Sequence, residues 1–414
     1  MTRVKRLLIL NRVKIAINHT RFSPTGGIEK YVYSLVEYLL NGGHEVHCFV
    51  RRWEPYPHPR LHFHAVPALP LGEGIKVLSF AYASALLLRG QRFDIVHAFS
   101  KTFEQDIYTD GSGCFDDYLI YLRSASLWRR LTTFRPLLAV AIRHLERRRF
   151  GCVGGSGDPP TTACPRVLAM SRMAQEQILD RYDFPPDQID VLYCGVDTTE
   201  FHPGSSQVWR EDFRRQHETG PTATVILFVG NDYRRKGLAT AIESLSRLQE
   251  GSRADGKKAG GSRASTVLWV LGKDRRQAQY ESLASRKGVQ ARFLGARGSP
   301  RDYLRAADVF VFPSLYDIFG NAALEALASG LPSIISARAG VSELVRDGVD
   351  GLLLRDPEDP EELRGHIQRL LPSDARSQIS REARKTASLY SLEKHFEEVL
   401  DVYQAVIEAR RQND

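Results

Sequence analysis

Short apolar runs alternate with segments of helical spacing through the second half of the chain. The expected strands span residues 224–229, 266–271, 291–294, 309–312 and 333–336, and the helices that follow them span 238–248, 276–285, 300–307, 321–329 and 341–346. Strands that alternate with helices of about 10–15 residues are typical of right-handed βαβ units and a parallel sheet. A last clear helix is expected after Asp359, a capping residue that precedes Pro360. This half of the chain is therefore predicted to form an α/β domain.

The first half shows a looser form of the same alternation. Strands are expected at 13–17, 45–50, 94–97 and 166–170, with a helix between Ile28 and Asn41 and a second helix capped by Ser171. At 414 residues the chain exceeds what one hydrophobic core usually supports. Two domains are therefore predicted.

A turn-rich segment from Cys194 to Pro203 separates the two halves. We place the boundary near residue 205, with an N-terminal domain over residues 1–205 and a second domain over 206–385. Residues 386–414 are expected to form a C-terminal helix that packs back toward the N-terminal domain. The stretches 151–160 and 251–265 are rich in glycine, serine and charge, and they predict exposed loops.

Cysteine content and hydropathy bear on the cellular compartment. The five cysteines are odd in number and form no Cys-x-x-Cys pair, which predicts free thiols in a reducing compartment. The longest apolar stretch, 77–88, is shorter than the roughly 20 residues that a membrane span requires. We expect a cytoplasmic protein, and peripheral attachment to the inner face of the plasma membrane stays open.

The net charge of +8 is concentrated in residues 121–150, which hold eight arginines against one acid, Glu146. Apolar residues interleave with these arginines, and Pro136 is expected to divide the segment into two short helices; the apolar residues are Leu122, Leu127, Trp128, Leu131, Phe134, Leu137, Val140, Ile142 and Leu145. Basic amphipathic helices with tryptophan bind anionic membrane surfaces. A solvated helix packed on its own domain explains the pattern equally well.

Three loops follow expected strands at the edge of the sheet where parallel α/β domains bind ligands. Gly26 and Gly27 form the first, although such a pair is more typical of a tight turn before a helix. The loop 230–237 contains Arg234, Arg235 and Lys236, which can neutralise a diphosphate leaving group or form solvated surface charge.

The third loop joins the strand at 309–312 to the helix at 321–329. Asp317 precedes this helix, where a helix cap is the simplest role for a carboxylate. Glu325 lies among alanines and leucines on a helix that should be buried on most sides. A carboxylate in such a position needs partners.

The segment from Tyr316 to Pro332 resembles the signature of the retaining GT-B glycosyltransferases grouped as family 4, Glu-x7-Glu. The matching positions are Asp317, Phe319, Gly320, Glu325, Ala326, Ala328, Gly330 and Pro332. Further matches are Val229–Gly230 with Arg235–Gly237, Leu271–Gly272, Phe293–Gly295, Ala307–Val309, Asp347–Gly348 with Gly351, and Gly195–Asp197 with Phe201 and Pro203. The resemblance runs the length of the chain and is most specific in the second half.

This resemblance implies two Rossmann-like parallel-sheet domains that face each other across a deep cleft, with the donor site in the second. It also implies a role for each candidate residue: Arg235 and Lys236 hold the diphosphate, and Glu325 accepts hydrogen bonds from the ribose hydroxyls. Asp317 contacts hydroxyls of the transferred sugar, and backbone amides are offered by Phe319, Gly320 and Asn321. Gly26 and Gly27 approach the donor phosphate from the opposite domain.

Retention of anomeric configuration in the family implies attack on the same face as the leaving group, with the leaving phosphate taking the proton of the acceptor. Arginine and lysine can neutralise that phosphate, and the sequence has no Asp-x-Asp motif, so neither a metal nor a cofactor is expected.

The sequence departs from the family pattern at two places. The first acidic residue of the signature is aspartate, Asp317, in place of the usual glutamate. The frequent His-Asp pair of the first domain is not evident near Asp110–Gly113. Both departures leave the sugar open.

A narrower likeness is to the subgroup of lipopolysaccharide core glucosyltransferases, through the loop 230–237, Tyr390–Leu392 and Asp106–Tyr108. It implies transfer of a hexose, glucose, from a UDP-sugar to a glycolipid or lipopolysaccharide-core-type acceptor.

Two alternatives remain in other functional classes. A nucleotide-sugar epimerase of the same architecture would convert the donor without any acceptor. A nucleic-acid-binding protein would use the arginines on phosphates, but it leaves 317–332 unexplained, so no nucleic-acid partner is expected.

Overall fold

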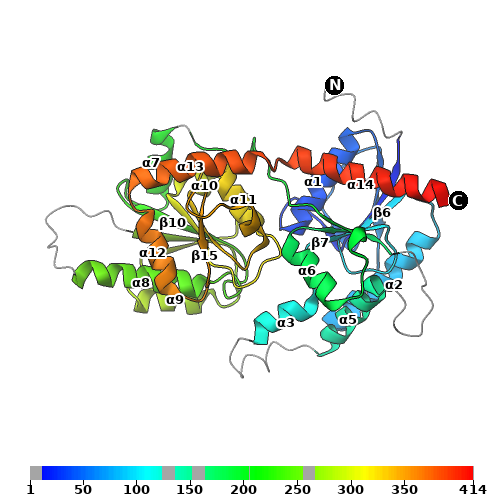
Figure 1. Cartoon of the computed structure of the whole chain (residues 1–414), viewed down its shortest axis with the longest axis horizontal. Coiled ribbons are helices and arrows are strands. Elements are labelled where there is room, and N and C mark those ends of the chain that lie inside the picture. The colour runs from blue at the N-terminus through cyan, green and yellow to red at the C-terminus, as the bar shows by residue number, and fades with distance from the viewer. Residues whose placement is uncertain (1–11, 124–135, 152–163, 205, 255–265, 414) are drawn as a thin grey trace. The chain divides into compact units, whose positions relative to one another are not determined.

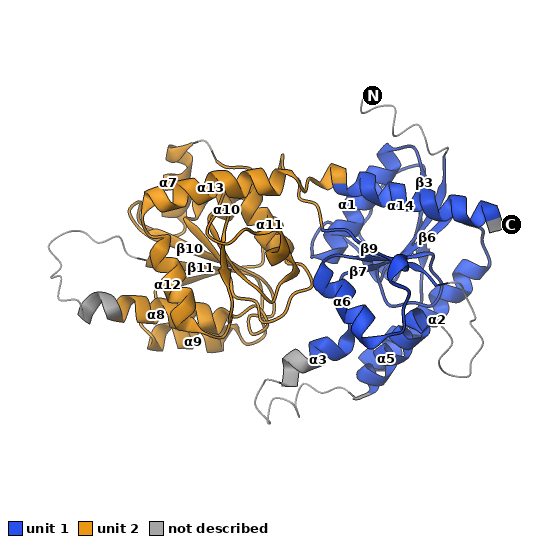
Figure 2. Ribbon diagram, in the orientation of Figure 1, with its two compact units in different colours: residues 1–193, 395–414 blue, residues 194–394 orange. Residues whose placement is uncertain are grey.

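The computed structural model describes residues 12–123, 136–151, 164–204, 206–254 and 266–413 (Figure 1). The chain divides into two compact units, Met1–Tyr193 with His395–Asp414, and Cys194–Lys394 (Figure 2). Among the described residues, no helix is both long and apolar enough to cross a membrane. Cys48, Cys114, Cys164 and Cys194 are free thiols, and Cys152 lies outside the described residues.

The first unit is built on a seven-stranded parallel sheet with the order β5-β3-β1-β6-β7-β8-β9. Its strands are β1 (Lys14–Asn18), β3 (Glu45–Val50), β5 (Leu61–Ala65), β6 (Ile95–Ala98), β7 (Ile107–Asp110), β8 (Arg166–Ala169) and β9 (Ile189–Val191), and β2 (Arg21–Phe22) pairs separately with β4 (Arg52–Trp53). The helices of this unit include α1 (Ile28–Asn41), α2 (Glu73–Arg89), α3 (Phe115–Arg123), α5 (Pro136–Phe150) and α6 (Arg172–Arg181). The direction of the strand order reverses between β1 and β6.

The C-terminal helix α14 (Leu392–Asn413) belongs to the first unit from His395 onward. The Nε2 atom of His395 lies 2.7 Å from the hydroxyl of Tyr31 on α1. Farther along the helix, the hydroxyl of Tyr403 lies 2.7 Å from Nδ1 of His97 on β6, and Nε2 of His97 lies 2.7 Å from the hydroxyl of Thr109 on β7. Two buried histidines therefore attach α14 to the first unit, His395 through α1 and His97 through the sheet.

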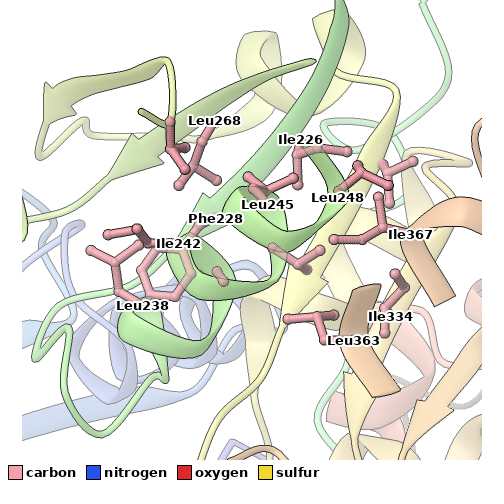
Figure 3. Close-up of a cluster of buried hydrophobic side chains, with 14 of the residues drawn as sticks. Ile226, Phe228, Leu238, Ile242, Leu245, Leu248, Leu268, Ile334, Leu363 and Ile367 are labelled. Atoms are coloured by element: carbon pink, nitrogen blue, oxygen red, sulfur yellow. The ribbon is translucent and has the colours of Figure 1, made fainter. Parts of the chain in front are cut away.

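The second unit has a six-stranded parallel sheet with the order β12-β11-β10-β13-β14-β15. Its strands are β10 (Thr224–Val229), β11 (Thr266–Leu271), β12 (Ala291–Gly295), β13 (Val309–Phe312), β14 (Ser333–Ser336) and β15 (Leu352–Leu354), and its helices include α7 (Gln207–Gln216), α8 (Leu238–Ala254), α9 (Gln277–Arg286), α10 (Arg301–Ala306), α11 (Asn321–Ala328), α12 (Pro360–Arg369) and α13 (Ser373–Ser388). Figure 3 shows the core that joins this sheet to α8 and α12, where Phe228, Leu245 and Ile367 are fully enclosed.

The unit boundary falls after Tyr193, before the position near 205 inferred from the sequence. The reason is the binding of residues 194–203 to the second unit. Arg384 on α13 donates hydrogen bonds to the carbonyl oxygens of Thr198, at 3.0 Å, and Phe201, at 2.7 Å. The turn-rich segment is therefore part of the second unit.

The expected secondary structure of the second half agrees closely with the structure, and the helix caps Ser171 and Asp359 are confirmed. Three expectations were wrong. The α-helix expected over 341–346 is a short 3₁₀ helix, Gly340–Leu344; an unexpected helix, α13, lies between the helix after Asp359 and the expected C-terminal helix; and 251–254 continue α8. Alanine and serine in α13 and the glycine within α8 weakened the sequence signals.

The buried histidines predict a pH-dependent attachment of α14. Burial lowers the pKa of His97 to about 3 and that of His395 to about 4. Between pH 6.5 and 4 the detached state binds protons that the folded state does not. As the pH falls through this range, the free energy that holds α14 in place should decrease by about 1.4 kcal/mol per pH unit for each histidine, and it should not change with pH above 6.5. Hydrogen exchange of α14 amides, corrected for intrinsic rates, should show this loss of protection. His395→Gln should reduce the pH dependence, and His202→Gln, an exposed site, should not; equal profiles would contradict the assignment.

Candidate active site

The strand order of the second unit reverses between β10 and β13, which are neighbours in the sheet. In open parallel sheets, ligands bind outside the carboxyl ends of the strands at such a reversal. Residues 230–237 follow β10, and the segment that leads to α11 follows β13. The structure therefore brings two of the three loops expected from the sequence together at one position.

Glycine allows the loop after β10 to approach the end of β13. Gly237 has a φ of +76°, and a Cβ atom there would lie 1.9 Å from the carbonyl oxygen of Pro313. The buried Tyr233 donates a hydrogen bond of 3.0 Å to the carbonyl of Gly272, and the amide of Leu315 donates one of 2.8 Å to the carbonyl of Arg235. These contacts hold Arg235 beside the segment that follows β13.

Arg235 and Lys236 converge on the carboxylate of Asp317. Nη1 of Arg235 lies 3.2 Å from Oδ2 of Asp317 and also donates a hydrogen bond of 2.9 Å to the carbonyl of Tyr316. Lys236 forms an ion pair with the same oxygen of Asp317 and lies 4.5 Å from the ring centre of Phe312. The side chains of Lys236 and Asp317 are only 12% and 15% exposed. Two cations thus share one carboxylate in a partly enclosed site.

The two cations keep Asp317 ionised. Burial alone would raise the pKa of Asp317, but the charges of Lys236 and Arg235 outweigh it, so the pKa lies below its ordinary value. Arg235 also pairs with Asp232, whose Oδ2 lies 3.6 Å from Nε of Arg235, so the two cations face two carboxylates. Arginine and lysine each carry several N–H donors, so both can still contact an anion.

The N-terminus of α11 lies beside this cluster in sequence and structure. Gly320 has a φ of +104°, and a Cβ atom there would lie 2.8 Å from Phe312. The carbonyl oxygens of Asp317 and Phe319 accept hydrogen bonds from Gly340, at 3.0 Å, and Val341, at 2.8 Å. These bonds fix the turn before Asn321, the first residue of the helix. The amides at the start of a helix have no partner within it and favour anions.

Glu325 lies about one turn inside α11 and is half-buried, whereas its helix neighbours Leu324 and Ala326 are buried. Asp317 does not cap α11, since Gly320 occupies the capping position. The sequence alone favoured a helix-capping role for Asp317. In the structure its carboxylate instead forms ion pairs with Arg235 and Lys236.

The glycine loop of the first unit precedes α1. Gly26 has a φ of +116°, Gly27 occupies the capping position of α1, and both are exposed. The conformation of Gly26 is one that other residues rarely adopt, which explains why glycine stands there. The role of this pair toward a donor phosphate stays a prediction.

Three polar residues that sequence reasoning did not select lie at the carboxyl edge of the first sheet. Asn18 ends β1, His19 follows it, and Asp110 ends β7. All three are buried, and both side-chain atoms of Asn18, Nε2 of His19 and Oδ2 of Asp110 have no hydrogen-bond partner among the described residues. Buried polar atoms in folded proteins usually have partners, so these atoms are candidates for ligand contacts. The signal available in the sequence was a polar residue directly after a buried strand.

Two protein families match the chain. The family described as Glycosyl transferases group 1 matches residues 210–386, and Glycosyltransferase Family 4 matches residues 25–103. The chain is thus similar to the group 1 and family 4 glycosyltransferases over these residues. This result confirms the family expected from Asp317, Glu325 and the surrounding signature, and with it the enzyme class.

Three relatives illustrate the range of this glycosyltransferase family. Lipopolysaccharide glucosyltransferase WaaG of Escherichia coli is 23% identical over 382 residues, which cover 90% of this chain and 94% of WaaG. A D-inositol 3-phosphate glycosyltransferase of Corynebacterium kroppenstedtii is 30% identical over 58% of this chain and 53% of that protein. An uncharacterised glycosyltransferase of Methanocaldococcus jannaschii is 28% identical over 59% of this chain and 60% of its own length. The match thus spans little more than half of the last two relatives.

Solved structures show the same fold. A crystal structure of WaaG, a glycosyltransferase involved in lipopolysaccharide biosynthesis, has a TM-score of 0.77 at 22% identity and covers 94% of this chain and 99% of its own. The structure of Anabaena HepE in complex with UDP-glucose has a TM-score of 0.70 at 15% identity and covers 95% of this chain and all of its own. The expected GT-B fold is confirmed. These relatives give no support to the epimerase or nucleic-acid alternatives.

The cluster predicts that Lys236 contributes more to anion binding than its neighbour Arg234. Lys236→Met should weaken binding of a nucleoside diphosphate at least about tenfold, because a cation within reach of the phosphates is lost. Thermal unfolding with millimolar UDP, GDP and ADP measures this effect, since a ligand at about 100 times its Kd adds about 2.7 kcal/mol. Arg234→Met is the matched control from the same loop. Equal shifts in both variants would remove Lys236 from the site.

Proposed function

We propose that this protein is a retaining hexosyltransferase that moves a hexose, glucose, from a UDP-sugar to a glycolipid or lipopolysaccharide-core-type acceptor. The observation that carries the proposal is the cluster of Arg235, Lys236 and Asp317 at the strand reversal of the second unit. A nucleoside-diphosphate sugar has its negative charge at the diphosphate, which the two adjacent cations of this cluster can contact.

In this proposal each donor-site residue has a distinct task. Arg235 and Lys236 neutralise the charge that develops on the leaving diphosphate. Asp317 holds the two cations in place and offers its carboxylate to hydroxyls of the sugar. Glu325 accepts hydrogen bonds from the ribose, and the amides of 319–321 at the start of α11 contact sugar and phosphate. The neutralisation comes from side chains, so the proposed reaction uses neither metal nor cofactor.

The chemical step breaks the bond between the anomeric carbon and the phosphate oxygen. The acceptor hydroxyl forms the new bond on the same face of the sugar, and its proton goes to an oxygen of the leaving UDP. The products are the glycosylated acceptor and UDP, so atoms and charge balance. This route requires no second carboxylate at glycosidase spacing.

The choice of donor and acceptor is supported by relatives. HepE has been solved in complex with UDP-glucose, and WaaG is named a lipopolysaccharide glucosyltransferase. For the acceptor we propose the carboxyl edge of the first sheet, where Asn18, His19 and Asp110 have buried polar atoms without partners among the described residues. Gly26 and Gly27 lie in the loop that follows the same edge, and we assign them to the donor phosphate.

Product analysis tests the reaction. We expect UDP-glucose and a lipopolysaccharide-core acceptor to give a product that keeps the α-configuration at the anomeric carbon, as read by proton NMR. Asp317→Asn should lower kcat by about 10²-fold or more, since one largely buried carboxylate that organises both cations is lost. Asp302→Asn, a partly exposed acid on α10, should not. Conversion of the donor to another sugar without acceptor would favour an epimerase, and inversion would contradict the retaining mechanism.

We further propose that α2 and α5 attach the protein peripherally to the inner face of the plasma membrane. The two helices pack closely, because a Cβ atom at Gly74 of α2 would lie 2.7 Å from the backbone of Leu137 on α5. Leu137 is 70% exposed, and Val140 and Leu86 are also exposed. Arg147 and Arg148 add exposed positive charge near the end of α5. Residues 124–135, which carry the tryptophan of the basic segment, lie outside the described residues.

Vesicle sedimentation tests the attachment. The protein should bind vesicles that contain anionic phosphatidylglycerol and release them at high salt, because charge and apolar contact act together. Leu137→Gln with Val140→Gln should weaken binding several-fold. Val208→Gln, an equally exposed apolar site on α7, is the control. Binding that is the same in all variants, or that occurs equally on neutral phosphatidylcholine, would contradict the proposed surface.

A further inference from the structure

A cluster of one glutamate and three histidines lies at the edge of the first sheet, away from the residues assigned above. Strands β3 and β5 are parallel neighbours, and β5 is the edge strand. Their register pairs His47 with His62 and Phe49 with His64. Because side chains alternate between the two faces of a strand, Glu45, His47, His62 and His64 all lie on one face.

The functional atoms of this cluster converge. Nε2 of His47 lies 3.0 Å from Oε1 of Glu45, and Nε2 of His62 lies 3.9 Å from the same oxygen. One ligand atom from each of these three residues lies within 4.8 Å of the other two. A tetrahedral zinc site with bonds of about 2.0–2.1 Å separates its ligand atoms by roughly 3.3 Å. Small side-chain rotations would therefore bring the three atoms to coordination distance.

A second interaction orients the central ligand. The other ring nitrogen of His47, Nδ1, lies 2.8 Å from Nε2 of His64, and the two rings stack. A histidine that binds a metal generally uses its second nitrogen in such a hydrogen bond, which fixes the orientation of the ring. His47 is buried, so it holds its position, whereas His62 is 46% exposed and gives access from solvent.

The surrounding cations leave one oxygen of Glu45 facing the histidines. Arg12 binds the opposite oxygen, Oε2, at 3.0 Å. Lys14, the register partner of Glu45 on β1, directs its ammonium group to the ring of Phe93, 4.9 Å from the ring centre.

We propose that Glu45, His47 and His62 bind a divalent transition-metal ion, with zinc as the preferred ion and His64 as a positioning residue. Two imidazoles and one carboxylate form a ligand set that zinc accepts, with water in the fourth position. The ion would join the edge strand β5 to β3. Glu45 begins β3, so the site lies at the amino end of that strand, whereas the residues assigned to the acceptor follow the carboxyl ends of β1 and β7. Its role is therefore structural and separate from sugar transfer.

Cobalt and zinc titrations of the untagged, full-length protein test the proposal. We expect one Co²⁺ per chain with the visible absorption bands of tetrahedral coordination, and displacement of Co²⁺ by Zn²⁺. His62→Gln and Glu45→Gln should each weaken binding at least about tenfold, because a ligand is lost. His58→Gln, a histidine in the loop before β5, is the matched control and should bind as the wild type does.

Melting temperature provides the second readout. Zinc should raise the Tm of the wild type and of His58→Gln, and should leave that of His62→Gln unchanged. Without metal, His62→Gln should melt with the wild type, since the side chain is half exposed, so loss of binding cannot come from unfolding. Binding by His62→Gln with wild-type affinity, or no tetrahedral cobalt spectrum, would overturn the proposal. Sugar transfer enters neither readout, so failure here leaves the proposed reaction untouched.

Discussion

The ion pairs that Asp317 makes with Arg235 and Lys236 connect the fold of the second unit to its chemistry. Removal of three charged groups from water is costly, and a partly enclosed ion pair often contributes little net stability. The cluster is better explained by ligand binding than by folding, because it holds two cations side by side at the strand reversal. A diphosphate would contact both cations, and Asp317 keeps them close together until it arrives.

Backbone conformation makes this cluster possible. Gly237 and Gly320 both have positive φ angles, and both pack against the end of β13, at Pro313 and Phe312. Any side chain at either position would meet these atoms within 3 Å and move its loop away from the strand. The reversal of strand order between β10 and β13 supplies the space, and the two glycines allow the loops to occupy it.

The sequence predicted the second unit better than the first for a physical reason. Its central strands are buried on both faces and appear as continuous apolar runs such as 224–229 and 309–312, separated by clear helices. In the first unit, β5 contains the alternating segment Leu61–Ala65, and β7 contains Thr109 and Asp110, so neither has the apolar run of a buried strand. The sequence also did not predict helix α2, because its apolar residues lie all around the helix and give no amphipathic pattern.

The residues proposed for the donor site were selected because a family signature names them, whereas their contacts could not be predicted. A capping role for Asp317 follows from its position before a helix, but three-dimensional proximity to residues 235 and 236 depends on two loops far apart in sequence. Asn18, His19 and Asp110 were missed because an isolated polar residue after a strand is common. Only their burial without partners among the described residues distinguishes them.

The first sheet illustrates how one parallel sheet can support separate functions at its two ends. Parallel strands place all their carboxyl ends at one edge, where the starts of helices favour anions. The amino ends lack such helix starts, so a cation there meets less repulsion. Glu45 and the two histidines beside it are at that end of β3 and β5, where a bound metal ion would not compete for a phosphate. The separation follows from strand direction alone, and it would allow the proposed structural metal to coexist with the proposed metal-independent reaction.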